Sequence, residues 1–221
     1  MELSGLFYIE PMKVEGPRLR AFYERLFAMG LKYYPLPRQP VPPAPYLAED
    51  LTFDEALDSL ILHLSTGQDA TIWLDDGRVP SYNVGFRPLR KGVIDRVVFH
   101  IDWYDDQRLR EAETRAALQV SRAVAEMFAP VLGVVSLGDG FPWVEVEWDD
   151  SGGSVKEVHL GWANLLSSGL LDDTTRERIK GMKPQVYESF ASGAVLFALG
   201  DRTAEVSKEA AAELERITAH W

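Results

Sequence analysis

His100 and Asp102 form the pair of side chains whose spacing is best suited to chemistry. They stand two residues apart in the apolar run 93–103, which predicts a strand, so both side chains should point to the same face. A histidine beside a carboxylate can hold a divalent metal or exchange protons. No third ligand or nucleophile follows at a recognisable spacing. The pattern therefore favours an oriented histidine on a sheet surface over the site of a metal-dependent hydrolase.

Two acidic pairs could also bind a divalent cation, Asp75-Asp76 and Asp105-Asp106. Each has a structural explanation in its local sequence, because Asp-Asp-Gly is common in turns and Asp105 stands where a helix needs an N-cap. The chain has no cysteine, which excludes disulfides, thiolate metal sites and a cysteine nucleophile. We therefore predict no catalytic residue, no metal ligand and no cofactor.

The segment 144–149 has the clearest pattern in the chain, a strict alternation of apolar and acidic residues. The apolar face carries Val144, Val146 and Trp148, and the acidic face carries Glu145, Glu147 and Asp149. This alternation predicts a strand that buries one face and exposes a row of carboxylates on the other. The row could hold a metal, keep an edge strand soluble or dock against a basic protein.

Composition limits the kinds of partner. The chain has 221 residues, of which 46% are hydrophobic, enough for a full core, and we expect a single domain over 1–221. A net charge of -11 argues against binding nucleic acid, because neutralising phosphates requires clustered Lys and Arg. The charge favours a basic protein partner, or serves solubility alone. No apolar run is long enough to span a membrane and no signal sequence is recognisable, so we expect a cytoplasmic protein.

The periodicity of the chain predicts alternating strands and helices. Strands are expected at 6–9, 70–74, 81–86, 93–103, 131–137, 143–148, 155–160 and 190–199, and helices at 18–29, 52–64, 105–128, 162–166 and 203–220. The proline-rich segment 34–46 is predicted to be an extended connector. Strand pairs followed by a covering helix indicate an α+β fold with an antiparallel or mixed sheet covered by helices.

Two C-terminal segments are similar to a known family. Gly161-Trp162-Ala163-Asn164-Leu165 resembles the Gly-Trp-x-Asn-Tyr segment of the immunity protein 52 group of bacterial proteins. The run 192–199 resembles the glycine-led apolar strand that follows there, with a terminal helix after it. Leu165 replaces the tyrosine of that pattern, and Ser192 replaces its first glycine. The resemblance covers the C-terminal third of the chain and implies a protein that binds and blocks a cognate toxin without catalytic residues.

The sequence therefore predicts a non-enzymatic binding protein, an immunity-like inhibitor of a basic toxin or effector. Its partner-binding residues are expected to be the acidic Glu145, Glu147 and Asp149, with Trp143 and Trp162 as apolar anchors. Two alternatives stay open. One is a metal-dependent hydrolase that uses His100, Asp102 and nearby acids, and the other is an acidic structural or accessory protein.

Overall fold

The computed structural model describes residues 2–35, 51–75, 80–102, 107–138, 144–149, 152–200 and 206–219. The strands are β1 (Glu2–Lys13), β2 (Lys32–Tyr33), β3 (Ala70–Asp75), β4 (Pro80–Arg90), β5 (Val93–Asp102), β6 (Pro130–Gly138), β7 (Val144–Asp149), β8 (Gly152–Val158), β9 (Ala163–Leu166), β10 (Val186–Ser189) and β11 (Val195–Ala198). The helices are α1 (Gly16–Ala28), α2 (Phe53–Thr66), α3 (Gln107–Met127), the short 3-10 turn η1 (Ser168–Leu170), α4 (Asp173–Gly181) and α5 (Lys208–Thr218).

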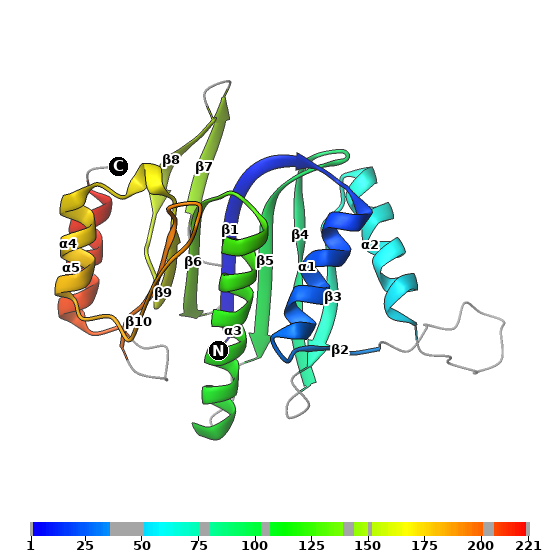
Figure 1. Ribbon diagram of the computed structural model, residues 1–221, viewed down its shortest axis with the longest axis horizontal. Helices are drawn as coiled ribbons and strands as arrows, with labels where there is room; N and C mark the ends of the chain where they lie inside the picture. The colour runs from blue at the N-terminus through cyan, green and yellow to red at the C-terminus, as the bar shows by residue number, and fades with distance from the viewer. Residues whose placement is uncertain are drawn as a thin grey trace.

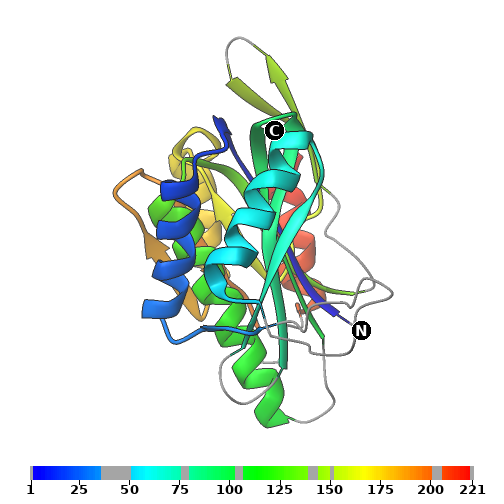
Figure 2. The same cartoon turned by 90° about the vertical axis from the view of Figure 1, so that its right-hand side faces the viewer.

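Nine of these strands form one sheet in the order β10-β11-β9-β6-β1-β5-β4-β3-β2 (Figure 1). Every pairing between the described strands is antiparallel. Strands β7 and β8 form a separate hairpin that projects beyond the end of the large sheet in both side views (Figures 1 and 2). The α+β fold with an antiparallel sheet is confirmed.

Helices α1, α2 and α3 cover one face of the sheet (Figure 1). Aromatic rings fill the space between this helix layer and the sheet, where Phe22 of α1 meets Phe86 of β4 edge to face at 5.4 Å between ring centroids. Helix α2 begins as the sequence predicts. The Glu55 backbone N–H donates to the Thr52 hydroxyl, and the Thr52 backbone N–H donates to the Glu55 carboxylate at 2.9 Å.

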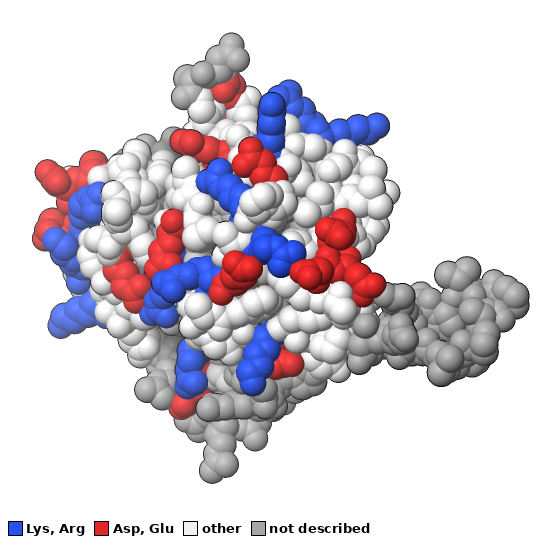
Figure 3. Space-filling view, turned by 45° about the vertical axis from the view of Figure 1, so that its right-hand side comes forward, with Lys and Arg blue, Asp and Glu red and all other residues white. Residues whose placement is uncertain are grey.

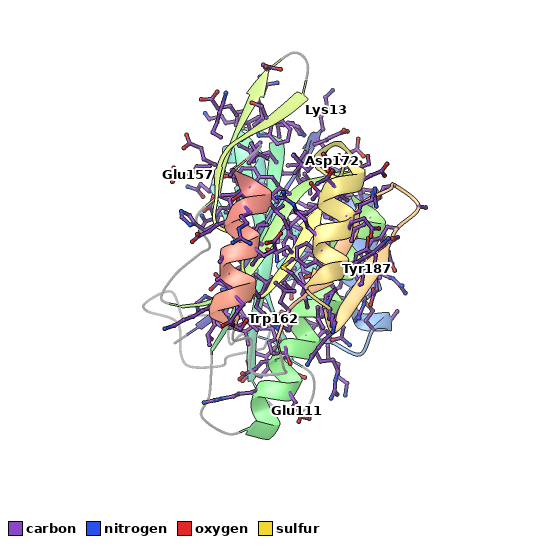
Figure 4. All side chains as sticks on the ribbon, turned by 90° about the vertical axis from the view of Figure 1, so that its left-hand side faces the viewer. Lys13, Glu111, Glu157, Trp162, Asp172 and Tyr187 are labelled. Carbon is purple, nitrogen blue, oxygen red and sulfur yellow. The ribbon has the colours of Figure 1, made fainter. Side chains whose placement is uncertain are left out.

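The opposite face of the sheet is covered in two separate parts. Helices α4 and α5 pack over β6, β9 and β11, where Ile179 and Leu214 contact the same apolar cluster as Phe197 (Figure 4). The β7–β8 hairpin packs over β1 and β5 instead. Among the described residues no helix packs on this face of β3 and β4. The hairpin lies beside this part of the sheet.

Residues 163–166 form strand β9, so the helix predicted at 162–166 is wrong. In β9 all four side chains are buried, and β6 and β11 pair on its two sides. A central strand with both faces covered has no polar alternation, and a short apolar run of this kind cannot be distinguished from a buried helical turn by periodicity.

The C-terminal region also differs in detail from the elements that the sequence predicts. The strand predicted at 190–199 is only Val195–Ala198, and it pairs with an unpredicted strand, β10. Gly193 has a φ of 81° in the turn between them, a backbone conformation that favours glycine. Helix α4 was not predicted at all. Most of the proline-rich connector, and the acidic residues Asp76, Asp105 and Asp106, lie outside the described residues.

Candidate functional site

The β7–β8 hairpin carries the acidic row that the sequence predicts. Glu145, Glu147 and Asp149 are exposed, whereas Val144, Val146 and Trp148 on the other side are partly buried. These apolar side chains pack against a small cluster on β1 and β5, formed by Leu6, Tyr8 and Val98. The alternation is confirmed. The apolar side is only partly buried because a two-stranded hairpin cannot enclose it fully.

A register shift adds a further carboxylate to this surface. Glu145 pairs with Glu157, but the next residue, Val146, pairs with Val155, so β8 carries one extra residue. As a result Lys156 and Glu157 are both exposed, and Glu157 points away from the body of the protein (Figure 4). The exposed side of the hairpin, which we call the acidic face, consists of Glu145, Glu147, Asp149, Lys156 and Glu157. It carries four carboxylates and one ammonium group.

The charges on the acidic face contribute little to folding. The Lys156 ammonium lies 3.2 Å from the Glu147 carboxylate, but both side chains are about half exposed or more, at 48% and 65%. A surface ion pair of this kind contributes at most about 1 kcal/mol to stability. Glu145 and Glu157 oppose each other across the hairpin with like charges. This juxtaposition of like charges is unfavourable for folding.

Two hydrogen bonds fix the hairpin to the large sheet. The Trp148 indole N–H donates to Asp95 Oδ2 at 3.0 Å, and the Tyr8 hydroxyl donates to the Val144 carbonyl at 3.1 Å. Asp95 is only 2% exposed, and Arg96 Nε donates to its other oxygen at 3.0 Å. Burial raises the pKa of Tyr8 above its ordinary value, so the hydroxyl remains a donor at neutral pH. These contacts therefore fix the position of the acidic face relative to the large sheet.

Asp95 reaches the hairpin because strand β5 bulges. Ile94 and Val97 both belong to the core under the helix layer, so the two residues between them share the opposite face. The pairing with β4 shifts at the same place, from Arg87 opposite Arg96 to Pro88 opposite Ile94. Asp95 was not predicted to be part of a site. The one signal was the break in the alternation of the predicted strand at 95–96.

His100 lies on the sheet face opposite helices α1, α2 and α3, in a row that crosses several strands. It stands opposite Asn83 of β4 and Ser4 of β1, and the Ser4 Oγ is 3.2 Å from His100 Nδ1. A cavity of about 240 Å³ opens beside it, bounded also by Thr71 and Val98. The side chain of Asp102 lies outside the described part of the chain. Within that part, no three His, Asp or Glu side chains are arranged to hold a metal ion.

Trp162 does not lie on the surface. The sequence predicts it as an apolar anchor for a partner, but its side chain is only 3% exposed and belongs to the core under the helix layer, so it offers a partner almost no surface. The turn around it is held by Asn164, which accepts from the Gly161 N–H at 2.8 Å and donates to the Gly161 carbonyl at 2.9 Å. A Cβ at Gly161 would lie 2.3 Å from the Val135 carbonyl oxygen. The Gly-Trp-x-Asn segment is thus a structural turn that leads into β9. Trp143 lies outside the described residues.

Comparison with known proteins shows a similar fold only. No family model matches the chain, and no curated protein matches it. Among solved structures, the Pseudomonas aeruginosa T6SS protein PA0821 is similar, with a TM-score of 0.55 and 11% sequence identity. The alignment covers 97% of this chain and 71% of that one, so it extends over nearly the whole fold described above. None of the described helices combines the length and apolar composition needed to cross a membrane.

Proposed function

We propose that this protein is an immunity-like inhibitor that binds a basic toxin or effector protein through the acidic face of its β7–β8 hairpin. One observation carries the proposal: four carboxylates stand exposed on a projecting hairpin that is anchored at Asp95 and contributes its apolar side to the core. The similarity to the immunity protein 52 group and the fold shared with a T6SS protein are compatible with this role.

The acidic face suits inhibition of a toxin whose own site is basic, such as a nuclease that binds phosphates. Carboxylates placed against such a site would occupy the positions of the phosphates and prevent substrate from entering. Opposite charges would also accelerate encounter, while buried apolar contacts would set the dissociation rate. The absence of cysteine suits a protein that acts in the reducing cytoplasm.

Charge distribution distinguishes the hairpin from the helix layer. On the side that carries α1, α2 and α3, acidic and basic side chains are interspersed (Figure 3). There Arg20 pairs with Asp54 at 2.6 Å and Arg25 pairs with Glu126 at 2.6 Å. A basic partner would therefore meet compensated charges on the helix layer and a net negative surface on the hairpin.

The test is capture of the partner by two forms of the protein. Immobilised wild type and the E145Q/E147Q variant are exposed to a lysate of the source cells, and the retained proteins are identified. We expect a basic protein that wild type retains and the variant retains less. Expressed alone that protein should arrest growth, and coexpression with wild type should restore growth.

A matched variant controls for net charge. Glu24 and Asp58 are exposed on α1 and α2, so E24Q/D58N also removes two charges, but from the helix layer. It should retain the partner as wild type does. A captured partner that is acidic, or one that all three forms retain equally, would count against the acidic face. A partner whose toxicity persists on coexpression would count against inhibition itself.

A further inference from the structure

We propose that a second surface site, a polar cavity between α3 and the turns that precede β9 and β10, binds a small carboxylate. The cavity, which we call the α3 cavity, has a volume of about 290 Å³. Its polar lining comes from Glu111, Arg115 and Arg122 of α3, from Trp162 and from Gln185. Figure 4 labels Glu111 and Trp162 at this end of the molecule. The site is separate from the hairpin, and the proposal does not depend on the inhibitor function.

The indole N–H of Trp162 is the first observation. The side chain is 3% exposed, and its Nε1 atom is buried with no hydrogen-bond partner among the described residues. Nearly all buried polar groups in folded proteins are hydrogen-bonded, because an unsatisfied buried donor is costly. Trp162 also lines the α3 cavity, and in the proposed complex the indole turns so that its N–H meets an acceptor in the cavity.

The two arginines of the cavity differ in how they are held. Arg122 is bidentate to Glu188, with Nε and Nη2 at 2.9 and 2.7 Å from its carboxylate oxygens. Arg115 lies two turns earlier on the same side of α3, and it forms no ion pair with any residue that the structure describes. Its guanidinium can therefore offer two parallel N–H donors to a ligand carboxylate.

The lining selects for a singly charged ligand of modest size. The indole and the guanidinium both donate, so the ligand must accept. Glu111 adds a negative charge to the same lining, which disfavours a dianion such as phosphate relative to a monocarboxylate. A single water occupies about 30 Å³ of liquid volume, so the cavity has room for a molecule as large as an amino acid.

The test uses sodium propionate as the probe and the indole N–H signal of Trp162 as the readout. The chain has six tryptophans, so its ¹H–¹⁵N spectrum contains few indole peaks, and W162F identifies the peak of interest. Titration with propionate should move this peak saturably, while sodium chloride at equal ionic strength should not. Inorganic phosphate should bind more weakly than propionate.

Arg115 provides the decisive variant, because its side chain is exposed and R115Q should fold normally. We expect R115Q to weaken propionate binding by about tenfold, since a charge-assisted bidentate contact is lost. R90Q removes an exposed arginine of β4 that does not line the α3 cavity, so its affinity should equal that of wild type. No saturable shift, a shift that chloride reproduces, or equal affinity in R115Q would overturn the proposal.

Discussion

Asp95 is the residue that connects the hairpin to the sheet, because its buried carboxylate accepts from both Trp148 and Arg96. Hydrogen bonds to a charged group contribute more than neutral ones, about 1.5–3 kcal/mol each. The position could not be predicted from the sequence. A bulge moves one residue to the other face of a strand, and only the pairing with neighbouring strands reveals it.

Trp148→Phe tests the hydrogen bond between the Trp148 indole and Asp95. It keeps a large ring against Leu6 and Val98 but removes the N–H that Asp95 accepts, so the free energy of unfolding should fall by about 1.5–3 kcal/mol. Urea denaturation measures the change. W73F is the matched control, because the Trp73 indole N–H has no hydrogen-bond partner among the described residues, and it should change stability by less than W148F. Equal losses in the two variants would contradict the proposed role of the Asp95 contact.

The buried hydroxyl of Tyr23 should make the free energy of unfolding depend on pH in the alkaline range. Its hydroxyl donates to the Val84 carbonyl at 2.9 Å, and burial raises its pKa well above 10. In the unfolded chain the phenol ionises near pH 10, but in the folded protein it stays protonated. Stability from this group is therefore complete below about pH 10 and is lost as pH rises beyond it.

Tyr23→Phe should separate this titration from other effects. The variant should be less stable at neutral pH by about 1 kcal/mol, because it lacks the hydrogen bond. Between about pH 8 and about pH 10.5 it should lose less stability than wild type, as measured by urea midpoints. If wild type and the variant lose the same stability over this pH range, Tyr23 does not titrate in this way.

At the scale of the elements, strands with one polar face were the easiest to predict. Strand β7 alternates because one side packs on Tyr8 and Val98 while the other meets solvent. Strand β9 was mistaken for a helix because both of its faces are buried. Helix α4 was missed because it is short and mostly polar, and Asp172, which caps it, resembles a loop residue.

Helix α2 shows how a local signal fixes an element boundary. Thr52→Ala removes one half of the capping box and should lower the free energy of unfolding by about 1 kcal/mol. Thr66→Ala, at the other end of the same helix, removes a hydroxyl that donates only to the His63 carbonyl and should cost less than about 0.5 kcal/mol. Chemical denaturation of both variants measures the difference. Similar losses would mean that the cap contributes little to the stability of α2.

At the scale of the whole molecule, the described charged side chains are paired on one layer and unbalanced on the hairpin. The helix layer pairs its acids with arginines at Arg20 and Arg25, whereas the hairpin exposes four carboxylates and one lysine. The sequence predicted three of these carboxylates from their alternation. It could not predict Glu157 as a member of the same face, because that depends on the extra residue in β8.

The most direct test of the central claim is the association rate with the captured basic partner, measured by stopped flow at ionic strengths from about 0.05 to about 0.5 M. We expect E145Q/E147Q to associate more slowly and with a weaker dependence on salt than wild type, with unchanged folding. E24Q/D58N should match wild type in both respects. An association rate and salt dependence that E145Q/E147Q leaves unchanged would contradict the role of the acidic face.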